Sequence, residues 1–249
     1  MAADATFLGM TTRAGAKFDS TDWSMVLHAR VDSARRQSAL EKLCAAYWLP
    51  LYGYLRRQGN GPADAEDLTQ AFLAYLISSD FLDRPSPEKG RFRGYLIGAL
   101  KHFLSHHFER HQALKRGGGV RFIEWAALDA ESEFAAVDQP GLDSSQAYER
   151  SWALTLLGRA LKRLETEQRD CGKLRQFETL REFLSVKPTR GDYERVGQQL
   201  GAAKGTVAVW IHRLSQRYAE LVKLEVAATV RDPAEVPSEL RHLVQALRQ

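Results

Sequence analysis

The sequence predicts an all-α protein made of two small helical domains joined by an acidic linker. Apolar residues recur at helical spacing almost throughout, no stretch alternates in the manner of a strand, and glycine- and proline-rich breaks separate the helical stretches. At 249 residues and 44% hydrophobic, the chain suits two small domains with packed cores. The predicted parts are an N-terminal extension (1–22), a first helical domain (23–117), an acidic linker (118–150), a second helical domain (151–224) and a tail (225–249).

The first domain is predicted to hold three helices. The first runs over 36–57, and the second begins after Pro62. Acidic side chains crowd the first turns of the second helix, where they complement the helix dipole. The third runs over 92–116 and ends at a run of three glycines. The acidic and polar residues near the start of the second helix are Asp64, Glu66, Asp67 and Gln70.

The modest net charge of +4 hides a strong separation of charge along the chain. From Arg84 to Arg116 there are eight basic and two acidic side chains, whereas the stretch 120–149 has seven acidic and one basic. Basic residues interleaved with aromatic rings suit nucleic acid, because phosphates supply affinity and rings stack on unpaired bases. The alternative is a solvated surface with the aromatics in the core. A further hypothesis is that the acidic linker shields this basic surface in the free protein.

Helical periodicity resumes at 151–169 and 173–184, and the segment 192–221 then predicts a helix-turn-helix. Tyr193, Val196 and Leu200 face inward on a short helix before a turn at Gly201. The second helix buries Val207, Ile211, Leu214, Tyr218 and Leu221, and its other face carries donors that suit a DNA groove. The alternative is an ordinary helix pair with a basic surface. The candidate DNA-contacting residues of this helix are Lys204, Thr206, His212, Arg213, Gln216 and Arg217.

Four histidines on the third helix, His102, His106, His107 and His111, include two pairs at the i, i+4 spacing that can bind zinc. No cysteine or well-placed carboxylate completes such a site, and no phosphate-binding glycine-rich lysine loop occurs. We therefore expect no metal, no cofactor and no enzymatic activity. The lack of an N-terminal apolar segment and of any long apolar run predicts a cytoplasmic protein with no membrane partner.

In this order, these segments resemble the extracytoplasmic-function sigma factors of bacterial RNA polymerase, in a variant group of the planctomycete type. The run Asp64-Ala65-Glu66-Asp67-Leu68-Thr69-Gln70 resembles the family's polymerase-docking helix, and Gly90-Arg91-Phe92-Arg93-Gly94-Tyr95-Leu96 resembles the region that opens the promoter. Residues 192–221 resemble the helix-turn-helix that reads the distal promoter element. The likeness covers 24–116 and 151–224, while the linker is longer than usual and Val209 and Trp210 replace more polar residues.

The resemblance implies a sigma factor that binds core RNA polymerase and directs promoter-specific initiation by reading and melting promoter DNA. Core polymerase would bind Asp64, Glu66, Asp67 and Gln70. An anti-sigma factor or a Ser/Thr kinase would be the regulatory partner. In the sigma-factor interpretation, melted promoter DNA would bind Arg91, Arg93, Lys101, Arg110, Lys115 and Arg116.

The alternative is a helix-turn-helix regulator of transcription that does not engage core polymerase.

Overall fold

The computed structural model describes residues 33–78, 92–113, 130–230 and 232–248. Within these ranges every regular element is a helix, which confirms the predicted all-α class. The predicted extension over 1–22 lies outside the described residues. The elements are α2 (Ser33–Arg57), α3 (Pro62–Ser78), α4 (Phe92–Ala113), α5 (Ala130–Val137), α6 (Ser144–Asp170), α7 (Leu174–Leu180), η3 (Arg181–Leu184), α8 (Arg190–Leu200), α9 (Lys204–Thr229), η4 (Pro233–Glu235) and α10 (Val236–Arg248).

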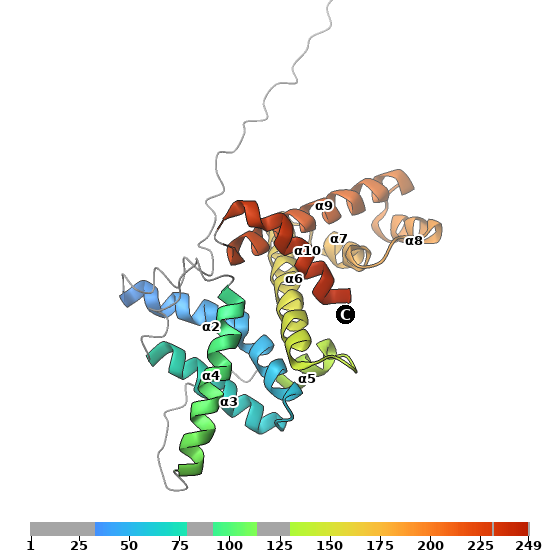
Figure 1. The fold of residues 1–249 in the computed structure, drawn as a ribbon. Helices are drawn as coiled ribbons and strands as arrows, with labels where there is room; N and C mark the ends of the chain where they lie inside the picture. Colours follow the sequence, from blue (N-terminus) through green and yellow to red (C-terminus); the bar gives the residue numbers. More distant parts are fainter. Residues whose placement is uncertain (1–32, 79–91, 114–129, 231, 249) are drawn as a thin grey trace, which may run out of the picture.

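Helix α6 is the central element of the molecule. One part of it packs against α2 and α5, and another packs against α7 and α9, while α10 lies across it (Figure 1). Its buried stripe includes Trp152, Leu156, Ala160 and Leu164, at the spacing of one helix face. The buried residues on both sides of α6 form one contiguous cluster. The division into two domains and its boundaries stay a prediction.

Aromatic side chains fill the core of α2, α3 and α4. The ring of Tyr47 meets that of Phe92 edge-on at 5.6 Å between centroids, and Phe72 lies 5.5 Å from Phe103. Tyr47, Phe72 and Phe92 are almost completely buried. Burial of such rings contributes much of the stability of a small core. Phe92 of α4 therefore lies in the core, as the alternative interpretation of the sequence predicts. Tyr95 and Phe103 of the same helix are partly buried.

The described part of the predicted acidic linker is mostly helical, and its first helix packs on α2. Glu131 of α5 forms an ion pair with Arg56 at 2.7 Å, and Asp138 forms one with Arg57 at 2.6 Å. Tyr52 donates a hydrogen bond to Glu131, and burial together with this carboxylate raises the pKa of Tyr52 to about 12. The carboxylates of α5 and of the residue that follows it thus neutralise arginines of α2.

Two helix ends differ from the sequence prediction. Helix α6 begins at Ser144, not at residue 151, because Asp143 caps it: its side chain accepts from the Gln146 backbone, and the Gln146 side chain accepts from the Asp143 backbone. This capping box satisfies donors that would otherwise lack partners at the helix start. Helix α9 continues to Thr229, beyond the predicted end at 221, because Val222 and Val226 extend its buried stripe.

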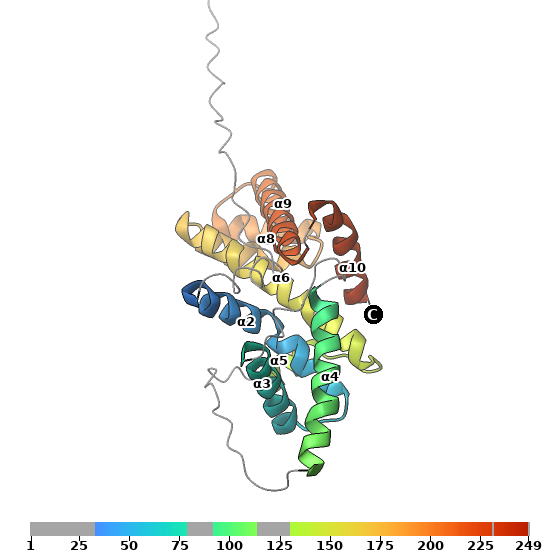
Figure 2. The same cartoon turned by 60° about the vertical axis from the view of Figure 1, so that its left-hand side comes forward.

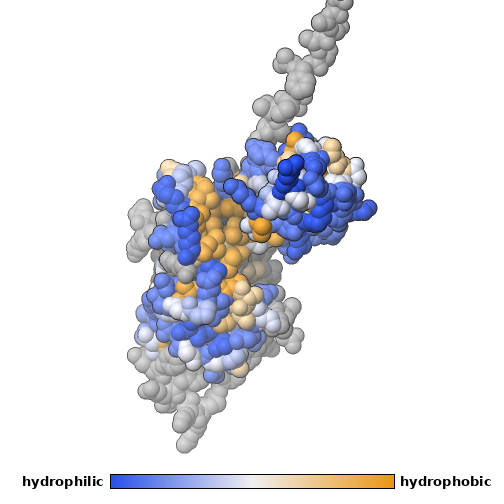
Figure 3. Space-filling view, turned by 90° about the vertical axis from the view of Figure 1, so that its right-hand side faces the viewer, coloured by the Kyte–Doolittle hydropathy of each residue, from blue (hydrophilic) through white to orange (hydrophobic). Residues whose placement is uncertain are grey.

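An apolar strip runs down the face formed by α6 and α10, between hydrophilic surfaces on either side (Figure 3). The partly exposed apolar residues of these helices include Leu157 and Leu161 on α6, and Leu240, Val244 and Leu247 on α10. Contiguous apolar surface of this kind is typical of protein contact sites. No helix in the described ranges is long and apolar enough to cross a membrane.

Candidate nucleic-acid interface

Helices α8 and α9 are joined by a tight turn that depends on glycine. Thr189 caps the start of α8, where its backbone N–H and its hydroxyl both donate to the Asp192 carboxylate, which lowers the pKa of Asp192 to about 2. Gly201 ends α8 with a left-handed φ of 65°, a conformation that costs glycine little. A Cβ on Gly197 would lie 2.6 Å from the Ala202 carbonyl oxygen, so only glycine permits this approach.

Helix α9 buries the stripe that its sequence predicts. Tyr218 is the partial exception, since it is half-buried and donates its hydroxyl proton to the Leu157 carbonyl at 3.1 Å. Burial raises the pKa of Tyr218 above its ordinary value. The packing fixes which face of α9 points outward. The fully buried members of the stripe are Val207, Ile211, Leu214 and Leu221.

Four of the six predicted DNA-contacting side chains lie on the outward face of α9, in its N-terminal half, without a partner among the described residues. All four are exposed, and within the described residues none forms an ion pair or a side-chain hydrogen bond. They offer hydrogen-bond donors and acceptors and one permanent positive charge. Val209 lies among them with 46% of its surface exposed. The four side chains are Thr206, His212, Arg213 and Gln216.

The other two predicted residues, Arg217 and Lys204, are held by carboxylates. Arg217 donates two hydrogen bonds of 2.8 Å to Glu167 of α6 and one of 2.8 Å to Glu220. These bonds raise the pKa of Arg217 and lower that of Glu167. Lys204 forms an exposed ion pair with Glu194 of α8. Arg217 therefore ties α9 to α6, whereas the exposed pair of Lys204 contributes little and opens readily.

Two adjoining clefts beside α9 add basic groups that the sequence reasoning missed. One, of about 390 Å³, lies between α7 and α9, and the other, of about 290 Å³, lies between the start of α7 and the end of α8. Trp210, Lys173 and Gln176 line both clefts, and neither is lined by a described carboxylate. Lys173 and Arg175 are exposed and follow the break at Gly172, which was their only signal in the sequence.

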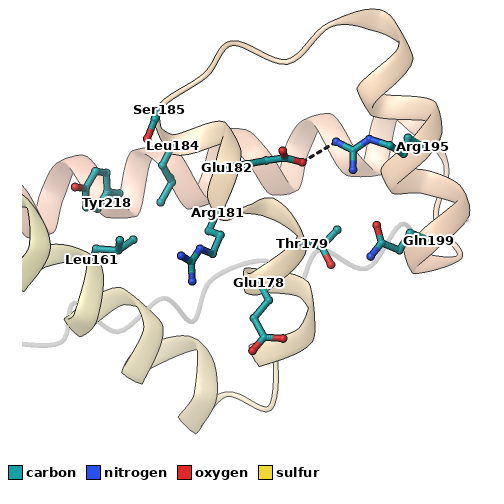
Figure 4. Close-up of a pocket in the computed structure, with 10 residues that line it drawn as sticks. All are labelled: Leu161, Glu178, Thr179, Arg181, Glu182, Leu184, Ser185, Arg195, Gln199 and Tyr218. Atoms are coloured by element: carbon teal, nitrogen blue, oxygen red, sulfur yellow. Dashed lines mark hydrogen bonds and ion pairs between the residues drawn. The ribbon is translucent and has the colours of Figure 1, made fainter. Parts of the chain in front are cut away.

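A third cleft, of about 610 Å³, is lined by residues of α6, α7, η3, α8 and α9 and has mixed polar and apolar character (Figure 4). Arg195 of α8 reaches Glu182 at 2.6 Å across part of it, while Leu161 and Tyr218 line its other end. Its lining residues include no histidine or cysteine and no carboxylate pair free of basic partners.

The acidic residues of α3 lie on its outer face. Ala65, Leu68 and Phe72 bury the inner face, which leaves Asp64 and Asp67 exposed without an ion pair to any described residue. The predicted polymerase-binding residues Glu66 and Gln70 are half-buried and contact each other at 3.3 Å. The surface is therefore negative and unneutralised within the described chain.

The basic residues of α4 divide into different environments. Arg93 is only 4% exposed and is enclosed by α6 and α10, so in this arrangement it cannot contact a phosphate. Lys101 is exposed, with its ammonium 6.0 Å from the centre of the Tyr54 ring. The remaining predicted contacts, Arg91, Lys115, Arg116 and the side chain of Arg110, lie outside the described residues.

The histidine pair His102 and His106 is exposed on α4, with the two Nε2 atoms 3.2 Å apart. In the described ranges no third histidine, cysteine or carboxylate joins a pair to form a possible metal site. Two imidazoles leave a zinc ion short of its usual ligands.

No family model matches the chain, and no curated protein and no solved structure was found to be similar to it.

Proposed function

We propose that this chain is a sigma factor that binds core RNA polymerase and directs promoter-specific transcription initiation. The observation that carries the proposal is the outward face of α9, where exposed donors lie free of ion pairs on a helix fixed by a close glycine turn. The acidic face of α3 and the exposed charge of α4 supply the further surfaces that such a factor needs. The resemblance described above links the three in this order.

In this proposal α8 and α9 form a helix-turn-helix, and α9 enters the major groove by its N-terminal turns. His212, Arg213 and Gln216 reach base edges, since these side chain types match the donor and acceptor pattern of the groove. The exposure of Val209 has a reason here, because an apolar group can contact a thymine methyl. Lys173 and Arg175, beside the start of α7, bind flanking phosphates.

Core polymerase binds the outer face of α3 through Asp64 and Asp67. Charge complementarity of this kind mainly raises the association rate and fixes orientation. The exposed part of α4, including Lys101, binds the melted strand. Strand separation is driven by binding of the unpaired bases, so the proposal assigns the chain no hydrolytic step.

The test is transcription in vitro with sigma-free core polymerase and a genomic promoter library. Wild type is compared with Asp67→Arg, and Glu133→Arg is the matched control because Glu133 is an exposed acidic residue on another helix. Discrete transcripts from wild type and the control, with none from Asp67→Arg, would support the proposal. Transcripts that survive the reversal of charge at Asp67 would remove the assigned docking surface.

The second candidate is a DNA-binding regulator that does not engage core polymerase. It is favoured by the fact that the proposed DNA surface is complete within α7, α8 and α9, without any contribution from α3. Direct binding to purified core polymerase distinguishes the two. Specific duplex binding with no polymerase binding and no transcripts would establish the regulator.

A further inference from the structure

Arg93, on the first turn of α4, is enclosed by groups from two distant helices. Its Nε lies 2.8 Å from Glu149 Oε2 of α6, and its Nη1 pairs with Glu239 of α10. The guanidinium lies over the Trp152 ring, 4.3 Å from the ring centre. Tyr148 donates a hydrogen bond of 3.1 Å to the Arg93 carbonyl. The side chain is therefore engaged on its edge by carboxylates and on its face by an aromatic ring.

Helix α10 is the element that closes this enclosure. Glu239 is 0% exposed, and His242 reaches Glu149 Oε2 at 2.9 Å. Arg150 of α6 donates to the carbonyl of Leu247 near the end of α10 at 2.9 Å. Figure 2 shows α10 beside α6, at the end of α4 that carries its first turn. Helix α10 thus folds back over the first turn of α4, the helix that carries the residues proposed to bind melted DNA.

The attachment of α10 depends on few apolar groups. Leu243 and Ala246 are its fully buried apolar side chains, whereas Val236, Leu240 and Leu247 pack against the core but stay partly exposed, and Val244 is exposed. A buried ion pair adds little net stability, because the cost of removing both charges from water offsets their attraction. Elements with few buried apolar contacts are the ones that open locally. A carboxylate on such a helix can also be displaced from its arginine by a competing anion.

We propose that α10 is an intramolecular competitor for nucleic acid: Glu239 of α10 occupies the position on Arg93 that a phosphate of the melted strand takes when α10 is released, while Glu149 of α6 stays in place. The inference rests on the proposed function and assigns it a mode of control. Guanidinium groups bind carboxylate and phosphate with the same forked geometry, so one can replace the other. The apparent affinity for single strands is then reduced by the fraction of molecules in the closed form.

The test uses full-length chains and a labelled single-stranded oligonucleotide, titrated by fluorescence anisotropy over a range of salt concentrations. Glu239→Gln removes the charge of the competitor, and Leu243→Asp releases α10 by placing a charge in its buried face. Gln245→Ala, on the exposed face of α10, is the matched control. Hydrogen exchange of the α10 amides reports release, and circular dichroism reports whether the remaining helices stay folded.

Release should raise single-strand affinity and steepen the dependence of log K on log salt by about 0.7, the value for one added phosphate contact. Adding Arg93→Gln to either variant should return the slope to that of wild type. Faster exchange in α10 with an unchanged slope would overturn the inference, and so would loss of helicity throughout the chain, because α10 would then be a fixed part of the core.

The same titrations separate this inference from the proposed function. Duplex binding that is lost in Arg213→Ala reports the α9 surface independently of α10. If duplex binding is present but the single-strand slope does not respond to release, only the role of α10 fails. If neither duplex nor single strand binds any variant at low salt, the proposed function fails and the inference fails with it.

Discussion

Two arginines predicted to contact DNA, Arg213 on α9 and Arg93 on α4, occupy opposite environments. Arg213 is exposed and has no ion pair within the described chain, whereas Arg93 is 4% exposed and contacts Glu149, Glu239 and Trp152. The same side chain is free to bind a ligand in one place and joins three helices in the other. The difference shows that the packing of other helices decides whether an arginine can bind a ligand.

The largest effect that this comparison predicts concerns stability. Arg93→Gln removes the guanidinium that pairs with the buried Glu239 carboxylate, and loss of one member of a buried pair costs about 3–5 kcal/mol. Arg213→Gln removes an exposed side chain and should change the free energy of unfolding by less than about 0.5 kcal/mol. Urea denaturation followed by circular dichroism measures both. Equal losses in the two variants would show that the environments do not differ as described.

The sequence was sufficient to predict burial where helical periodicity alone decides which side chains face the core. The buried stripe of Val207, Ile211 and Leu214 follows from helical spacing alone, and so does the outward face that carries Arg213. The environment of Arg93 could not be predicted, because its partners come from α6 and from α10 at the far end of the chain. Runs of basic residues report charge, and only packing decides which members remain in water.

The start of α6 was missed for a more local reason. The segment around Asp143 is rich in acidic, serine, proline and glycine residues, and these favour a linker in a reading by composition. The same residue types also favour helix starts, and the pairing of Asp143 with Gln146 converts the last residues of the predicted linker into helix. The clefts lined by Lys173 could not be predicted, because the α9 residues that form their other side are distant from Lys173 in the sequence.

The close turn between α8 and α9 provides a second contrast, between two glycines. Gly197→Ala would place a Cβ 2.6 Å from a backbone carbonyl oxygen, and we expect a loss of about 1–3 kcal/mol, as for overpacking in a core. Gly158→Ala on α6 meets nothing within 4 Å and should stabilise the helix by up to about 1 kcal/mol. Thermal unfolding of the two variants measures the contrast. A neutral Gly197→Ala would mean that the turn can relax.

Arg213 and Arg217, neighbours on α9, should differ in DNA binding. Arg213→Ala should weaken specific duplex binding by about 1–3 kcal/mol, the usual cost of a lost base contact. Arg217→Ala removes a side chain that Glu167 and Glu220 already hold, so its effect on DNA affinity should be smaller. Lys173→Ala should reduce the salt dependence by about one phosphate without changing sequence preference. Anisotropy titrations with specific and scrambled duplexes separate these effects.

The smallest expected effect is the pH dependence of the Arg217–Glu167 contact. Hydrogen bonds from Arg217 hold the pKa of Glu167 below its ordinary value of 4.5. Its stabilisation is therefore fully present above pH 4.5 and is lost as the pH falls through the lower folded value. Both side chains are partly exposed, so solvent screening limits the contribution to about 0.2–1 kcal/mol.

Glu167→Gln should therefore flatten the dependence of the unfolding free energy on pH below 4.5, as measured by urea denaturation at a series of pH values. Arg217→Gln should produce most of the same flattening, because it removes the largest cause of the depressed pKa and leaves the carboxyl group in place. If only Glu167→Gln has an effect, Arg217 is not what holds the carboxylate in its charged form. Arg217 would then be held by Glu220 alone, and the assignment of Arg217 to the contact between α9 and α6 would no longer hold.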